Sequence, residues 1–194
     1  MTTVYTIGHS NHEFDRFVRL LQQANVTLVV DVRSRPRSGY VPHFNGPEMR
    51  DGLPKRGIDY LFMGNVLGGM PADPRFYDAE GFVLYSDIAA TDTFRAGTDR
   101  LLELASRSTT AVTCGEENPT DCHRRLLIGR VLRERGVDVR HIRGDGRIQT
   151  EDDLLAAEES TMGPPTLFNL GGERPWSSTR SVSPRRPPRS SSSS

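Results

Sequence analysis

The chain has 194 residues, of which 35% are hydrophobic, and its 25 Lys and Arg residues balance its 25 Asp and Glu residues. A uniformly basic surface for nucleic acid is therefore not indicated, and no apolar run reaches the length of a membrane span. The first residues, MTTVYTIGHS, lack the basic and apolar regions of a signal peptide, so we expect a cytoplasmic protein whose two cysteines are free thiols.

The first part of the chain alternates predicted strands and helices. Residues 4–10 are a short β-branched and aromatic run that predicts a strand. The apolar spacing over residues 12–25 predicts a helix, and both Ser10 and Asn11 are suited to cap it. Residues 27–34 form a nearly continuous apolar run, which is typical of a parallel strand buried on both faces.

The remaining elements follow in the same alternation. A loop rich in Pro and Gly leads to a helix closed by Gly57, and a long loop over residues 65–82 follows the third strand. Gly136 is the expected stop of the last helix. The further predicted strands are residues 58–64, 108–114 and 137–143, and the further predicted helices are residues 47–56, 91–107 and 122–136.

This alternation predicts one α/β domain over residues 1–150. We expect a mainly parallel sheet of about five strands, flanked by helices in a Rossmann-like arrangement. Residues 151–160 form a short acidic segment. Residues 161–194 are rich in Pro, Ser and Arg, and they hold too few apolar groups to offset the entropy of ordering, so we expect a disordered tail there.

Polar residues follow three of the predicted strands. Ligands of parallel sheets bind beyond the carboxyl ends of the strands, so these residues are expected at a single site on one edge. They are Gly8, His9 and Ser10 after the first strand, Asp31, Arg33, Arg35 and Arg37 after the second, and Cys114 and Glu116 after the fourth.

The stretch TCGEENPTDCHRR, residues 113–125, contains both cysteines of the chain. A disulfide between Cys114 and Cys122 is disfavoured by the expected reducing compartment. A metal site at Cys114, Cys122 and His123 is less favoured, because a C-x7-C-H spacing lacks the paired C-x2-C knuckles of zinc modules. No metal and no cofactor are therefore expected, and the metal site stays open as a third possibility that elemental analysis would decide. A reactive thiol and a buried packing cysteine remain as alternatives.

In the functional interpretation, Cys122 lies just before a helix, where the helix dipole and the neighbouring cations lower the pKa of a thiol. His123 or His9 assists it, and Glu116 is a general acid or base. Alternatively, Glu116 is a loop carboxylate paired with Arg124. Asp121 is most simply a helix N-cap.

The arginines are the expected anion ligands. Arg33, Arg37 and Arg124 carry planar guanidinium groups, which suit phosphate or carboxylate. Asp31 in a buried strand requires a partner, and Arg33 or Arg124 would serve. No P-loop or dinucleotide-binding glycine motif is present, which argues against a standard nucleoside-triphosphatase or dinucleotide enzyme.

Taken in order, these motifs resemble the family called domain of unknown function 488. The resemblance covers about residues 4–147, and it implies a single, typically bacterial or archaeal α/β domain with no established reaction. Gly115 stands where Ala or Ser is more usual in the family. The family's motif residues fall on Gly8, His9, Ser10, Asp31, Arg33, Arg37, Asn45, Glu116, Cys122, His123 and Arg124.

Two functions are consistent with these patterns. The first is a small enzyme that acts on an anionic substrate, a nucleotide or a nucleic-acid-derived group, through a Cys/His/Glu/Arg site. The second is a non-enzymatic module that binds a nucleotide or nucleic acid through the same arginines, with the arginine-rich tail adding salt-sensitive contacts. The sequence indicates no membrane partner, and it leaves the oligomeric state open.

Overall fold

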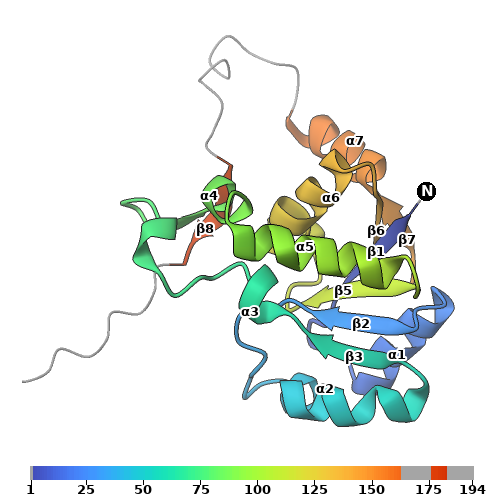
Figure 1. Ribbon diagram of the computed structural model, residues 1–194. Coiled ribbons are helices and arrows are strands. Elements are labelled where there is room, and N and C mark those ends of the chain that lie inside the picture. The colour runs from blue at the N-terminus through green and yellow to red at the C-terminus, as the bar shows by residue number, and fades with distance from the viewer. Residues whose placement is uncertain (1, 163–175, 183–194) are drawn as a thin grey trace, which may run out of the picture.

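The computed structural model describes residues 2–162 and 176–182. Its centre is a six-stranded sheet in the order β3-β2-β5-β1-β6-β7 (Figure 1). Five of the strands are parallel, and β7 is antiparallel to β6. The strands of this sheet are β1 (Thr3–Gly8), β2 (Leu28–Asp31), β3 (Asp59–Phe62), β5 (Thr110–Cys114), β6 (Asp138–Ile142) and β7 (Ile148–Thr150).

Helices connect these strands, so the predicted α/β class with a mainly parallel sheet is confirmed. Gly57 and Gly136 follow helical segments with φ of 76° and 74°, as expected for glycines that end helices. The helices are α1 (Phe14–Gln23), α2 (Gly46–Gly52), α3 (Gly64–Leu67), α4 (Tyr85–Ala89), α5 (Asp92–Ala105), the π-helical η5 (Arg124–Gly129), α6 (Arg130–Glu134) and α7 (Glu151–Met162).

The two faces of the sheet carry two separate hydrophobic clusters. Neighbouring residues of β2 divide between them, since Val30 belongs to one cluster and Val29 to the other. Leu101 of α5 packs with Val30, whereas Phe17 of α1 and Met49 of α2 pack with Val29. Burial on both faces explains why the parallel strands read as continuous apolar runs in the sequence.

Two predicted helix caps are wrong. Helix α1 begins after Glu13, whereas Ser10 has a φ of 48° and lies in the turn before it. Asp121 belongs to a short 3-10 turn, Pro119–Asp121, and the segment η5 begins after His123. In both places a short turn lies between the predicted cap and the first residue of the helix, so the helix begins later than the sequence pattern indicates. Cys122 therefore lies where it was expected, just before the helical segment.

The expected disordered tail is partly wrong. Residues 177–181 form β8 (Ser177–Ser181), which pairs antiparallel with β4 (Phe82–Leu84) of the long loop. Trp176 anchors this strand: its Nε1 donates to the carbonyl oxygen of Leu126 at 2.6 Å, and its ring lies 4.3 Å from the guanidinium carbon of Arg130. Residues 163–175 and 183–194 of the predicted tail lie outside the described residues.

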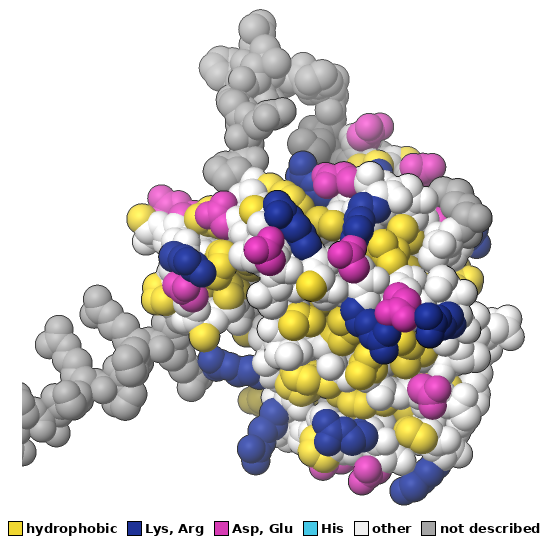
Figure 2. All heavy atoms as spheres, viewed as in Figure 1, with side chains coloured by type: hydrophobic (Ala, Val, Ile, Leu, Met, Phe, Trp, Pro, Cys, Tyr) yellow, Lys and Arg dark blue, Asp and Glu magenta, His cyan; other side chains and the backbone are white. Residues whose placement is uncertain are grey.

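The acidic segment 151–160 is helical, since it forms most of α7. Within the described ranges, no helix combines the length and the apolar character needed to cross a membrane. Positive and negative side chains are interspersed over the face shown in Figure 2. That face therefore carries no continuous patch of one charge.

Candidate functional site

The three strands with polar ends are neighbours, because β5 lies between β1 and β2. Gly8 is level with Cys114, and Asp31 is level with Thr113. The backbone continues this alignment beyond the strands: the N–H of His9 donates to the carbonyl oxygen of Cys114 at 3.0 Å. The predicted meeting of these segments at one edge of the sheet is therefore present in the fold.

A pocket of about 250 Å³ opens at this edge. Cys114, Glu116 and His123 line it together with Arg33 and other residues of the loop after β2. Ser178, Thr179 and Arg180 of β8 also line it. The site is thus closed by a segment that lies far from the motif in the sequence.

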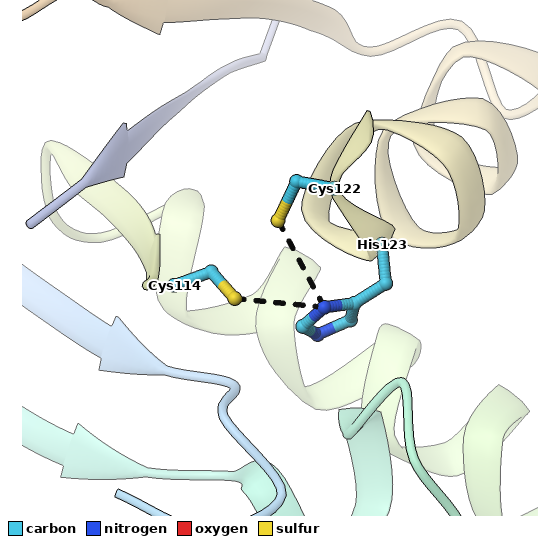
Figure 3. A group of neighbouring side chains, drawn as sticks. All are labelled: Cys114, Cys122 and His123. Carbon is cyan, nitrogen blue, oxygen red and sulfur yellow. Dashed lines mark hydrogen bonds between the residues drawn. The ribbon is translucent and has the colours of Figure 1, made fainter. Parts of the chain in front are cut away.

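The side chains of Cys114, Cys122 and His123 converge (Figure 3). Cys114 and His123 line the pocket, whereas Cys122 is buried behind it. The two sulfur atoms lie 3.6 and 4.0 Å from Nδ1 of His123. Both sulfur atoms also lie within hydrogen-bond distance of Oε2 of Glu116, at 3.3 Å from Cys114 and 3.2 Å from Cys122. Both cysteines are free, so the cluster holds two thiols, an imidazole and a carboxylate.

The imidazole of His123 is fixed from its other side. Its Nε2 lies 3.1 Å from the carbonyl oxygen of Val32, which can only accept, so Nε2 carries the proton. Nδ1 faces the two sulfur atoms. Gly69 makes room for the ring, since a Cβ at this position would lie 2.4 Å from Cγ of His123.

The pKa values of the two cysteine thiols are shifted in opposite directions. Burial favours the neutral form of Cys122, but a hydrogen bond from Cys114 and the positive charges of Arg124 and His123 outweigh it and lower the pKa of Cys122 well below its usual range. The hydrogen bond to Cys122 and burial raise the pKa of Cys114. Burial works against a charged His123, yet its contacts with Cys122 and Glu116 raise the pKa of the imidazole.

Asp31 and Arg33 form the predicted buried ion pair. Nη2 of Arg33 lies 2.6 Å from Oδ2 of Asp31, and Nη1 donates to Nε2 of His9 at 2.9 Å. The ring of His9 stacks on Phe44, and burial lowers the pKa of His9 to about 4. His9 is therefore a neutral acceptor for Arg33, and its contacts are with that arginine rather than with Cys122.

Arg124 has a different place from the one expected. Its side chain is completely buried, and its guanidinium donates to the carbonyl oxygens of Glu116 and Glu117 and to Oγ1 of Thr6. The carboxylate of Glu117 instead pairs with Arg143 at 2.8 Å. Arg124 thus holds the loop after β5 and supplies positive charge beneath Cys122, instead of facing the pocket.

Gly8 is required by the same loop. A Cβ on Gly8 would lie 1.7 Å from the carbonyl oxygen of Glu116, which is the atom that Arg124 binds. By contrast, a Cβ on Gly115 would meet only Nε2 of His9, at 3.9 Å. The loop therefore passes directly over the end of β1, and this close approach sets the position of Glu116.

Of the predicted site residues, Arg33, Glu116 and His123 line the pocket, whereas the others lie behind it or apart from it. Arg37 is exposed, Ser10 is half-buried in the turn before α1, and the Oδ1 of Asn45 accepts from the N–H of Ser38 at 2.6 Å. Asn45 therefore shapes the loop after β2.

Other pocket residues were missed by the sequence reasoning. Tyr85, whose phenol pKa is raised by burial and by the nearby cysteines, lies at the start of α4. Arg180 was also missed, and it is exposed at the pocket together with Arg35, which belongs to the predicted group of arginines after the second strand. The one sequence signal for the β8 wall was Trp176, the only tryptophan of the chain. A large aromatic residue offsets the ordering cost of a segment that is otherwise polar.

The fold and the pocket define an α/β protein with a thiol, imidazole and carboxylate cluster at the carboxyl edge of a parallel sheet. The model of the family described as domain of unknown function DUF488 matches residues 13–131, which is more than half of the chain. The protein belongs to this family, as the motifs indicated. Comparisons with curated proteins and with solved structures give no match.

Proposed function

We propose that this protein is a small enzyme that acts on an anionic substrate, a nucleotide or a nucleic-acid-derived group, in the pocket at the edge of the sheet. One observation carries the proposal: Cys114, Glu116 and His123 line the same pocket as Arg35 and Arg180. Such a pocket can hold an anion by its guanidinium groups and present it to acid–base groups below.

Arg35 and Arg180 are the proposed anion ligands. Both are exposed, and within residues 2–162 and 176–182 neither guanidinium has a hydrogen-bond or ion-pair partner. Arg33 is engaged by Asp31 and His9, so it shapes the rim rather than supplying a free charge. A pocket of about 250 Å³ suits one phosphorylated group or one base better than a whole dinucleotide.

Glu116 is the proposed general acid or base. It is exposed to solvent at the mouth, while its carboxylate reaches both thiols. Cys122 is fully buried, so we no longer assign it direct attack on the substrate. Its thiolate acts through the cluster on the floor of the pocket. Free thiols of this kind persist in a reducing compartment, and we place the protein in the cytoplasm on that ground.

The test is a thermal-shift and turnover screen of the full chain with inorganic phosphate, ribose 5-phosphate and nucleoside monophosphates. We expect at least one phosphorylated compound to raise the melting temperature and to be converted, as followed by chromatography. The double variant Arg35→Gln/Arg180→Gln should bind it at least about tenfold more weakly, the loss expected when charge-assisted hydrogen bonds are removed. Glu116→Gln should bind it and fail to convert it.

Two outcomes would contradict the proposal. If the double arginine variant binds the compound as tightly as the wild type does, Arg35 and Arg180 are not the anion ligands. Binding without conversion, with steep salt dependence and no response to Glu116→Gln, would instead favour the non-enzymatic binding module. Exposed Arg100 pairs with Glu103 on α5, and Arg100→Gln is the matched control for loss of a surface charge.

A further inference from the structure

The floor of the pocket has the geometry of a metal site. The two sulfur atoms and a ring nitrogen of His123 all lie within 4.8 Å of one another. A zinc ion held tetrahedrally, at about 2.3 Å from sulfur and 2.0 Å from nitrogen, places sulfur and nitrogen about 3.5 Å apart. The separations found here are 3.6 Å for Cys114 and 4.0 Å for Cys122 (Figure 3).

We propose that Cys114, Cys122 and His123 bind one zinc ion, and that its fourth coordination position faces the pocket. Cys114 and His123 line the pocket, whereas Cys122 closes the site from the buried side. Three protein ligands and one open position are the pattern of catalytic zinc sites, while structural sites use four protein ligands.

The surroundings of the three ligands support this assignment. Metal-bound histidines usually donate their second N–H to a carbonyl or carboxylate, which fixes the ring and directs the other nitrogen at the ion. Nε2 of His123 makes this contact with the carbonyl oxygen of Val32 at 3.1 Å. Cys114 ends β5, and Cys122 lies between the 3-10 turn Pro119–Asp121 and the N-cap of η5, His123, so regular structure positions both sulfur ligands.

The donor set indicates which metal the site takes. Two thiolates and an imidazole favour zinc and similar soft or borderline ions, whereas magnesium and calcium prefer sites made of oxygen atoms. Glu116 does not belong to the group of atoms within 4.8 Å of one another. Its carboxylate lies beside the sulfur atoms, where it is placed to exchange a proton with a water molecule at the open position.

This inference deepens the proposed function, and the catalytic role of the metal rests on it. A water molecule on the zinc ion loses a proton to Glu116, and the resulting hydroxide adds to an electrophilic carbon or phosphorus atom of the anionic substrate. The bond to the leaving group then breaks, and the leaving group takes the proton from Glu116. The reaction is a hydrolysis that consumes one water molecule and requires no other reactant.

The spacing argument against a metal depended on zinc modules that bind through two local knuckles. Here the ligands come from two elements joined by the short loop 115–121, which folds back so that the start of η5 faces the end of β5. Sequence spacing alone does not reveal this arrangement. It also accounts for a cysteine that is sealed from solvent, since a metal ligand does not need to reach the substrate.

The experiment measures metal content and then ligand type. The full chain is purified without added metal, its two thiols are verified as reduced, and zinc is quantified by elemental analysis. After removal of zinc by a chelator, Co²⁺ is added as a spectroscopic probe. We expect one equivalent of either metal, visible bands typical of tetrahedral cobalt and sulfur-to-cobalt charge-transfer bands. Cys122→Ser and His123→Asn should each weaken Zn²⁺ binding by more than about 100-fold.

Thr113→Val is the matched control, because it lies next to Cys114 and its hydroxyl has no hydrogen-bond partner within the described residues. This variant and Glu116→Gln should both keep the cobalt spectrum. The proposal is overturned if the wild-type chain with two reduced thiols binds neither metal, or if its cobalt spectrum lacks thiolate bands. This criterion holds even if the ligand variants fail to fold.

The metal and the function are tested separately. If the protein binds no metal but converts a substrate, the proposed zinc site is wrong and the proposed enzymatic function stands. If the protein binds one equivalent of metal through its thiolates but neither binds nor converts any compound of the screen, the zinc site stands and the proposed function is wrong.

Discussion

Asp31 and Arg33 lie two residues apart at the end of β2 and form a buried ion pair with two contacts. Nε of Arg33 donates to Oδ1 of Asp31 at 2.9 Å, and Nη2 donates to Oδ2 at 2.6 Å. Tyr60 adds a third donor to this carboxylate at 2.8 Å. The pair holds the loop after β2, because Arg33 also binds the carbonyl oxygen of Phe44.

Replacement of Arg33 by Met should destabilise the protein strongly. The change leaves the carboxylate of Asp31 buried without its cation, and removal of one partner of a buried pair costs about 3–5 kcal/mol. Urea unfolding measures the loss. Arg100→Gln, which breaks the exposed pair with Glu103, should cost less than about 1 kcal/mol. Equal losses in the two variants would contradict this prediction.

Gly8→Ala should disrupt the loop that carries Glu116. The new Cβ would lie 1.7 Å from the carbonyl oxygen of Glu116, a backbone atom that cannot rotate away. We expect a lower melting temperature and weaker binding at the pocket. Gly115→Ala is the control at the adjacent position, since its Cβ would meet only Nε2 of His9 at 3.9 Å. A stable Gly8→Ala variant with an unchanged pocket would show that the loop does not depend on this approach.

Gly69→Ala should displace the imidazole of His123. Its Cβ would lie 2.4 Å from Cγ and 2.5 Å from Cβ of that histidine, so the ring must shift and lose its alignment with Val32. We expect Co²⁺ affinity to fall about 10–100-fold, as for the loss of a contact that orients a ligand. Gly39→Ala, with nothing within 4 Å of its Cβ, should bind cobalt as the wild type does.

Acid should destabilise the protein through His9. Its pKa is lowered from 6.5 to about 4 by burial, so the unfolded chain binds a proton more readily than the folded chain between these values. Stability therefore falls as the pH decreases from 6.5 towards 4, by at most about 3 kcal/mol for this group. In the His9→Gln variant, the part of the decrease in unfolding free energy that comes from protonation of His9 should be absent. Urea unfolding at several pH values compares the two slopes, and identical slopes would exclude His9 as the cause.

The sheet and the rim of the site could be predicted because each depends on local patterns. The buried strand 28–31 is apolar on both faces, and its polar end, Asp31, marks where the strand leaves the core. The direction of Arg124 could not be predicted, since an arginine after a strand faces solvent more often than the interior. Its burial follows from carbonyl groups of the loop after β5, whose path depends on contacts distant in the sequence.

The amino-acid composition of residues 177–181 did not predict the strand β8, which lines the pocket. Ser177–Ser181 contains no apolar residue, and nothing in such a segment signals a strand. Its pairing is supported instead by Ser178, whose hydroxyl accepts from the N–H of Val83 at 2.9 Å, and by Trp176 against Arg130. Such tertiary contacts are invisible until the partner segment is known.

The place of β8 in the chain has a consequence for biosynthesis. Every strand of the central sheet precedes residue 151, and Cys114, Cys122 and His123 have all been synthesised well before Ser178. While the ribosome is still extending the chain, the cluster is accessible from the side that β8 later covers. An ion bound by the proposed site would have access during this interval, before Arg180 adds its positive charge to the pocket lining.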